Sequence, residues 1–135
     1  YVYFIYGNYY CFNAVTGSEG EGNAVLIRAA EIIEGKEPAL GYRKLNSGSH
    51  EIANGPAKLC IALQIDKKFN GHDITQKGEL FVAEGEKTTD RNIVSTKRIG
   101  ISKGMELPYR FIVKGSPFVT KHRHNNFVHN SKNKS

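Results

Sequence analysis

The chain has 135 residues and a formal net charge of +6. This length is enough for one domain with a core of its own. The apolar content of 39% is ordinary, and no apolar run approaches the roughly 20 residues that cross a bilayer. Composition therefore argues against a wholly disordered chain and against a membrane protein. The basic charge favours an acidic partner, with nucleic acid as the first candidate.

Residues 1–13 contain five of the seven tyrosines. Aromatic and β-branched residues favour strands, and Gly7-Asn8 favours a turn because both residues tolerate positive φ. We predict a β-hairpin in which alternation places Tyr3 and Tyr6 on opposite faces. Rings on an exposed turn could stack on bases or enter a base stack. The alternative is that these rings are part of the core.

The next segments are predicted to be a flexible acidic loop at residues 16–22 and a buried strand at residues 24–30. Arg28 lies in the middle of that strand. Because an unpaired guanidinium is expensive to bury, Arg28 should either find partners in a polar cavity or reach the strand's edge.

Residues 34–55 read as a loop with short helical turns, followed by a helix within residues 54–63 that carries Pro56 in its first turn. Helical spacing places three residues on one face of that helix: Leu59, Cys60 and Leu63. Lys58 lies near the helix start, where it would meet a phosphate or simply be solvated.

Further along, we predict a short helix at residues 73–76, a strand at 79–84, one or two short strands within 93–101 and a final strand at 109–114. Residues 121–135 form a polar, basic tail that we predict to be disordered. Three histidines lie in this tail, and a solvated terminus is favoured over a metal site there.

The two cysteines, Cys11 and Cys60, lie far apart in apolar surroundings. We predict free buried thiols rather than a disulfide, which indicates an intracellular protein. The chain has no initiating Met and opens inside a strand-like run. We therefore expect it to be the later portion of a longer protein.

Five blocks occur in a fixed order: YVYFIYGNYYCFN (1–13), AVLIRAAE (24–31), NGPAKLC (54–60), RIGI (98–101) and PYRFIVKGSPFV (108–119). With these blocks the chain resembles the alkyladenine (3-methyladenine) DNA glycosylase family of mammalian type, over residues 1–120. It corresponds to the C-terminal two-thirds of such a protein. The resemblance implies a single mixed α+β domain with a curved, mainly antiparallel sheet and a protruding β-hairpin.

The function implied by the resemblance is base-excision repair. Such an enzyme flips an alkylated or deaminated purine out of double-stranded DNA and hydrolyses its N-glycosidic bond, leaving an abasic site. Flipping is needed because the scissile bond is inaccessible in the base stack. The resemblance implies a monomer that uses no cofactor, metal or membrane. It would work in the nucleus of a eukaryote, or in the cytoplasm and nucleoid of a bacterium.

The resemblance also assigns residues at the hairpin. Tyr6 matches the wedge that enters the minor groove and fills the gap left by the flipped nucleotide. Asn8 and Tyr9 match the positions that flank this wedge against the DNA. Tyr3 matches an aromatic wall of the base pocket, and Asn13 matches the residue that disfavours guanine by crowding its exocyclic amino group.

Outside the hairpin, Arg28 and the backbone carbonyl of Ile99 match the groups that position the attacking water, and Lys58 matches a phosphate contact. The family's general base is a glutamate in an upstream Glu-Thr-Glu-Ala-Tyr-like segment, which this chain does not contain. None of the glutamates near the hairpin or the following strand lies in such a segment: Glu19, Glu21, Glu31 and Glu34. We therefore expect little or no base release from this chain alone.

Two other classes of function remain open. One is a non-catalytic DNA-binding module or degenerate homologue, which an upstream glutamate motif would argue against. The other is a generic basic β-rich domain whose aromatic rings are all core. That reading fails if Tyr6→Ala weakens binding to damaged DNA without lowering thermal stability.

Overall fold

The computed structural model describes residues 1–126. Residues 127–135 of the predicted tail, including His129, lie outside the described part. The chain divides into two compact units. The first comprises residues 1–84 with 118–120, and the second comprises residues 85–117 with residues 121–126 of the described part. The prediction of a single domain over residues 1–120 stays a prediction.

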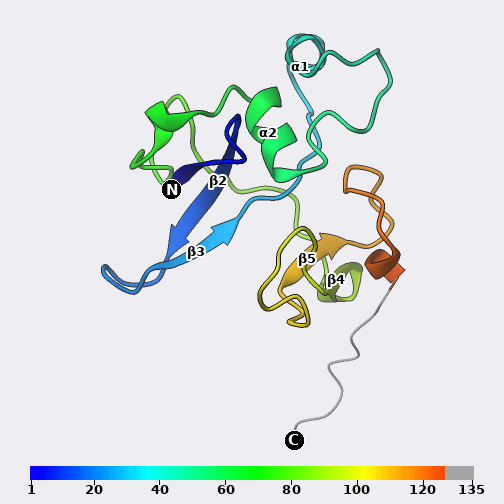
Figure 1. Ribbon diagram of the computed structural model, residues 1–135. Helices are drawn as coiled ribbons and strands as arrows, with labels where there is room; N and C mark the ends of the chain where they lie inside the picture. The colour runs from blue at the N-terminus through cyan, green and yellow to red at the C-terminus, as the bar shows by residue number, and fades with distance from the viewer. Residues whose placement is uncertain (127–135) are drawn as a thin grey trace, which may run out of the picture. The chain divides into compact units, whose positions relative to one another are not determined.

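The first unit is built on a three-stranded antiparallel sheet in the order β1-β2-β3 (Figure 1). The strands are β1 (Val2–Ile5), β2 (Tyr9–Thr16) and β3 (Asn23–Leu26). The aromatic and β-branched run at the N-terminus therefore forms the predicted hairpin. Together with the helices described below, these strands confirm the predicted α+β class.

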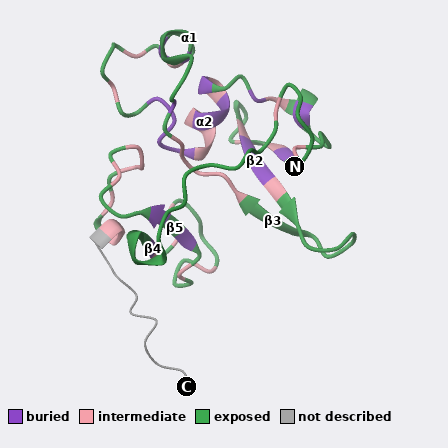
Figure 2. Ribbon diagram, turned by 180° about the vertical axis from the view of Figure 1, so that it is seen from behind, coloured by how far each residue is buried: buried purple, intermediate pink, exposed green. Residues whose placement is uncertain are grey.

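The predicted buried strand at residues 24–30 is wrong in its length and its burial. β3 ends at Leu26, and Figure 2 shows most of this strand in the colour of exposed residues. Val25 is 53% exposed. The Ile27 N–H still donates to the Phe12 carbonyl at 3.0 Å, but the Ala30 N–H donates to the carbonyl of Ala53 at 3.0 Å. The chain leaves β2 for this new partner, so Arg28 follows the strand instead of lying within it.

Two α-helices pack in the first unit, α1 (Lys36–Arg43) and α2 (Pro56–Ala62). α1 lies in the region predicted to contain helical turns. α2 has Pro at its first position, as predicted, where the missing N–H costs nothing. The predicted apolar face is wrong at Leu63, which is 45% exposed, because the helix ends one residue earlier. Ile65 is buried in its place.

The core of this unit collects apolar side chains from the sheet, both helices and the segments between them. α2 packs on β2 and on α1. Burying one large aliphatic or aromatic side chain stabilises a fold by roughly 1.5–3 kcal/mol. The buried cluster consists of Val2, Phe12, Ile32, Ala39, Leu40, Ile52, Ala53, Leu59, Cys60, Ala62, Ile65 and Phe69.

The short helix predicted at residues 73–76 is wrong, and a 3₁₀ helix lies earlier, at Lys67–Phe69. The Asp73 carboxylate accepts hydrogen bonds from the Thr75 backbone N–H at 2.8 Å and from its hydroxyl at 2.6 Å. Such a local side-chain turn competes with helix formation.

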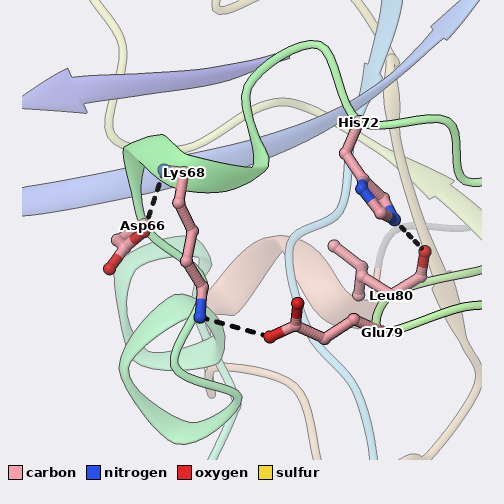
Figure 3. A network of polar contacts seen from close by, with 5 residues as sticks. All are labelled: Asp66, Lys68, His72, Glu79 and Leu80. Carbon is pink, nitrogen blue, oxygen red and sulfur yellow. Dashed lines mark hydrogen bonds and ion pairs between the residues drawn. The ribbon is translucent and has the colours of Figure 1, made fainter.

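The strand predicted at residues 79–84 is also absent from the described structure. Figure 3 shows the polar contacts that hold this segment. The Lys68 ammonium pairs with Glu79 at 3.2 Å, and the His72 ring bonds to the Leu80 carbonyl at 2.9 Å. The His72 side chain therefore occupies the Leu80 carbonyl, a backbone acceptor that a neighbouring strand would otherwise use.

The second unit contains a two-stranded antiparallel sheet of β4 (Ile93–Thr96) and β5 (Arg110–Val113). Both lie within segments predicted as strands. Alternation buries Val94 and Thr96 on β4 and Arg110 and Ile112 on β5. A 3₁₀ helix at Arg123–Asn126 lies in the first part of the predicted tail.

Among residues 1–126, no helix is long and apolar enough to cross a membrane. Both cysteines are free thiols in buried positions.

Candidate functional site

The turn between β1 and β2 consists of Tyr6, Gly7 and Asn8. Tyr6 has φ of +53° and Gly7 has φ of +73°, the sign pattern of the mirror-image turns that suit hairpins. Left-handed backbone costs a residue with a Cβ about 1–2 kcal/mol. The prediction that Tyr6 lies on a strand, on the face opposite to Tyr3, is therefore wrong. It lies in the turn itself, with 77% of its surface exposed.

Tyr6, Gly7, Asn8 and Tyr9 together form the hairpin tip. Asn8 is exposed beside Tyr6, and Tyr9 is exposed where β2 begins. The reading in which every ring of the first thirteen residues is core is wrong for this structure. Four of those aromatic rings are exposed: Tyr1, Phe4, Tyr6 and Tyr9.

Tyr3 lies on β1 directly opposite Cys11 and is half-buried. Its ring stacks on that of Tyr1 with the centroids 5.5 Å apart. Burial raises the pKa of Tyr3 to about 12, helped by a hydrogen bond with Cys11 and by the negative charges that Cys11, Tyr1 and Tyr6 carry when deprotonated. The phenol is therefore neutral at physiological pH.

Asn13 lies on β2 and is buried, at 8% exposure. Its side-chain Nδ2 donates to the carbonyl of Tyr1 at 3.1 Å, and its backbone N–H donates to the same oxygen at 2.9 Å. Two residues apart on one strand, Cys11 and Asn13 point to the same face of the sheet. The amide of Asn13 is thus fixed in orientation on the face that carries Tyr3.

Arg28 is half-buried just beyond β3. The Ile27 N–H still donates to the Phe12 carbonyl, and Arg28, the next residue, lies close enough to Cys11 for the two side chains to interact electrostatically. Burial lowers the pKa of Arg28, and the negative charge that Cys11 carries when deprotonated opposes this shift. Tyr3, Cys11, Asn13 and Arg28 therefore gather on one face of the three-stranded sheet, which we call the pocket face.

Lys58 lies in the first turn of α2, and its ammonium bonds to the side-chain oxygen of Asn54 at 3.0 Å. Asn54 is itself buried, and its carbonyl accepts a hydrogen bond from the Thr120 hydroxyl. The sequence did not predict that Asn54 anchors the Lys58 side chain. The phosphate contact assigned to Lys58 stays a prediction.

Ile99 belongs to the second unit and follows β4. It is half-buried and lines a cavity of about 390 Å³ within that unit. Its neighbour Arg98 holds the following loop, because its guanidinium donates to the carbonyls of Lys103 at 3.3 Å and Gly104 at 3.0 Å. The role of the Ile99 carbonyl as a water ligand stays a prediction.

Cys11 is the pocket-face residue that the sequence interpretation missed. A turn of residues 6–8 fixes the pairing of the two strands, and counting back from it places Cys11 opposite Tyr3. The described residues contain no group of three or more His, Cys, Asp or Glu side chains that could hold a metal ion.

The protein therefore presents an exposed aromatic turn, the hairpin tip, next to the pocket face. The family model for methylpurine-DNA glycosylase matches residues 1–117. The chain belongs to this family, which confirms the resemblance seen in the sequence.

Several curated relatives carry the name "Putative 3-methyladenine DNA glycosylase". One from Carboxydothermus hydrogenoformans is 48% identical over 121 residues, covering 90% of this chain and 63% of the relative. A relative from Methanocella arvoryzae is 46% identical, covering 90% and 61%. One from Francisella tularensis is 43% identical, covering 90% and 63%. The chain thus spans a little under two-thirds of the length of these relatives.

Proposed function

We propose that this chain is part of a DNA glycosylase that releases alkylated purines such as 3-methyladenine from double-stranded DNA by hydrolysis. Family membership and the names of the relatives support this assignment. The observation that carries it is the hairpin, whose tip exposes Tyr6 while the adjoining strands carry the pocket face.

The hairpin tip is suited to opening a duplex. A flat ring on a protruding turn can enter the minor groove and replace a flipped nucleotide in the stack. Unstacking a base costs roughly a few kcal/mol, and less at a damaged pair. A ring already exposed on a fixed turn needs little reorganisation before it inserts. Asn8 and Tyr9 then flank Tyr6 against the DNA.

The pocket face is suited to a purine that carries positive charge. The neutral, electron-rich ring of Tyr3 attracts a cationic base, by about 1 kcal/mol or more when water is excluded. Asn13 is held by the Tyr1 carbonyl, so it cannot swing away from a larger base. Crowding by Asn13 would disfavour the exocyclic amino group of normal guanine. Deaminated purines, which lack that group or its equivalent, are also accepted in this proposal.

Hydrolysis needs a water molecule that adds to C1′ of the sugar while the bond from C1′ to the base nitrogen breaks. Arg28 and the Ile99 carbonyl hold this water in the proposal, and a glutamate from an upstream segment takes its proton. In this proposal the 135 residues alone release little or no base. The enzyme works as a monomer on DNA inside the cell, in the nucleus or the nucleoid.

The second candidate is a DNA-binding module without chemistry. It is favoured by the positions of the acidic residues in the first unit. Glu21 is exposed and bonded to the Ser18 backbone at 2.9 Å, and Glu31 and Glu34 are exposed. A general base is more effective in a closed site from which water is excluded, and none of these three glutamates is buried.

Base release separates these proposals. Duplex DNA containing hypoxanthine or 3-methyladenine is incubated with the 135-residue chain and with the same chain extended by an upstream Glu-Thr-Glu-Ala-Tyr-like segment. We expect abasic sites only with the extended chain, and none after its general-base glutamate is changed to Gln. Equal release by both chains would overturn the assigned roles. No release by either would favour the binding module.

A further inference from the structure

Of the nine residues that line the cavity of about 390 Å³ in the second unit, three are lysine or arginine and two are histidine. Lys97 and Arg98 follow β4, and Arg123 lies between His122 and His124 in the segment after residue 120. A single carboxylate, that of Glu106, also lines the cavity, and Ile99 and Met105 supply apolar wall. The family model ends at residue 117, before the histidines.

The basic groups are crowded together. The rings of His122 and His124 lie 4.4 Å apart between centroids, and the His124 backbone N–H donates to Nδ1 of His122 at 3.2 Å. Burial lowers the pKa of His124, and the neighbouring His122 ring and the positive charges of Arg123, Lys97 and Arg110 lower it further. Lys97, Arg98 and Arg123 outnumber Glu106 in the lining, and a hollow whose lining carries a net positive charge concentrates positive electrostatic potential inside it.

The walls are held in place by hydrogen bonds. Arg110 is buried on β5, and its Nη1 donates to the Thr96 hydroxyl at 3.0 Å and to the side-chain oxygen of Asn125 at 2.9 Å. This bridge ties the segment containing Arg123 to the two-stranded sheet. Arg98 fixes the other wall through the carbonyls of residues 103 and 104. Charges held in advance bind an anion with less ordering cost.

We propose that this cavity binds a nucleotide-sized sugar phosphate, with the phosphate among Lys97, His122 and Arg123 and the sugar against Ile99 and Met105. The volume lies within the range of about 300–1,000 Å³ typical of small-molecule sites. A guanidinium and an ammonium make charge-assisted hydrogen bonds to phosphate oxygens. The site requires no damaged purine, so it goes beyond the glycosylase proposal, with which it shares Ile99.

Binding is tested with the 135-residue chain and 2′-deoxyadenosine 5′-monophosphate, with amide chemical shifts followed by NMR. We expect concentration-dependent shifts at Gly100 and His124. Arg123→Gln should weaken binding about tenfold, since it removes a charged hydrogen bond. Lys97→Gln is a second variant from the other wall. Arg91→Gln is the matched control, because Arg91 is an exposed arginine of the same unit outside the cavity.

Undamaged duplex DNA forms the second arm of the experiment. If both ligands shift the same amides, the site takes a phosphate of the DNA backbone. If only the mononucleotide does, the ligand is a free nucleotide. Shifts with neither ligand, or an equal loss in Arg91→Gln, would overturn the proposal. Tyr6→Ala should leave mononucleotide binding unchanged, which keeps this test separate from that of the glycosylase function.

Discussion

The tip and the pocket face belong to the same hairpin, but they are built in opposite ways. At the tip, Tyr6 is exposed and has a left-handed backbone conformation that its side chain disfavours. On the pocket face, Asn13 is buried and hydrogen-bonded, and Tyr3 is stacked and half-buried. Strain at an exposed position does not help the fold, so it is better explained by recognition. Substitutions at the two ends should therefore separate stability from DNA binding.

The largest expected effect is at the buried end of the hairpin. Phe12→Ala removes a ring from the core cluster and leaves a cavity. It should lower the free energy of unfolding by about 3–5 kcal/mol. Tyr9→Ala at the tip should change it by no more than about 0.5 kcal/mol. Urea denaturation of both variants measures the contrast, and similar losses at the two positions would break it.

A smaller effect of opposite sign is expected at the turn. Tyr6→Gly removes the Cβ from a residue with φ of +53°. It should raise the free energy of unfolding by about 1 kcal/mol, because Gly adopts this conformation without strain. Tyr6→Ala keeps the Cβ and should show no such gain. A loss of stability in Tyr6→Gly would mean that the ring is part of the fold.

A further effect concerns the dependence of stability on pH. The pKa of Tyr3 is about 12 in the folded chain, mainly through burial, against about 10 in an unfolded chain. Above pH 10 the unfolded state gives up this proton while the folded state keeps it. Stability should therefore fall as the pH rises from 10 to 12. The denaturation midpoint should fall less steeply with pH in Tyr3→Phe than in the wild-type chain across this range. Equal slopes in the two chains would contradict a raised pKa of Tyr3 in the folded state.

Local patterns predicted much of this structure. The aromatic run and the Gly7-Asn8 pair predicted the hairpin, and Pro56 predicted the start of α2. Patterns failed where a distant partner decides the outcome. β3 ends before Arg28 because Ala30 bonds to Ala53, and residues 79–84 are not a strand because His72 takes the Leu80 carbonyl.

The candidate site was predictable to a similar extent. The resemblance named Tyr3, Asn13 and Arg28, and pairing across the sheet gathers them on one face. Sequence alone did not show the positive φ of Tyr6, because tyrosine has no preference for it. The basic cavity also went unseen, since its two walls, residues 97–106 and 122–124, are separated by residues 107–121 in the chain.

The most direct measurement compares the wild-type chain with Tyr6→Ala in two assays on the same samples. One assay measures affinity for duplex DNA with and without hypoxanthine, and the other measures the thermal unfolding midpoint. Because stacking is worth about 1–3 kcal/mol per base, Tyr6→Ala should weaken binding to the damaged duplex about tenfold or more at an unchanged midpoint. Unchanged binding to damaged DNA, or a loss of binding matched by a lower midpoint, would contradict a wedge at the hairpin tip.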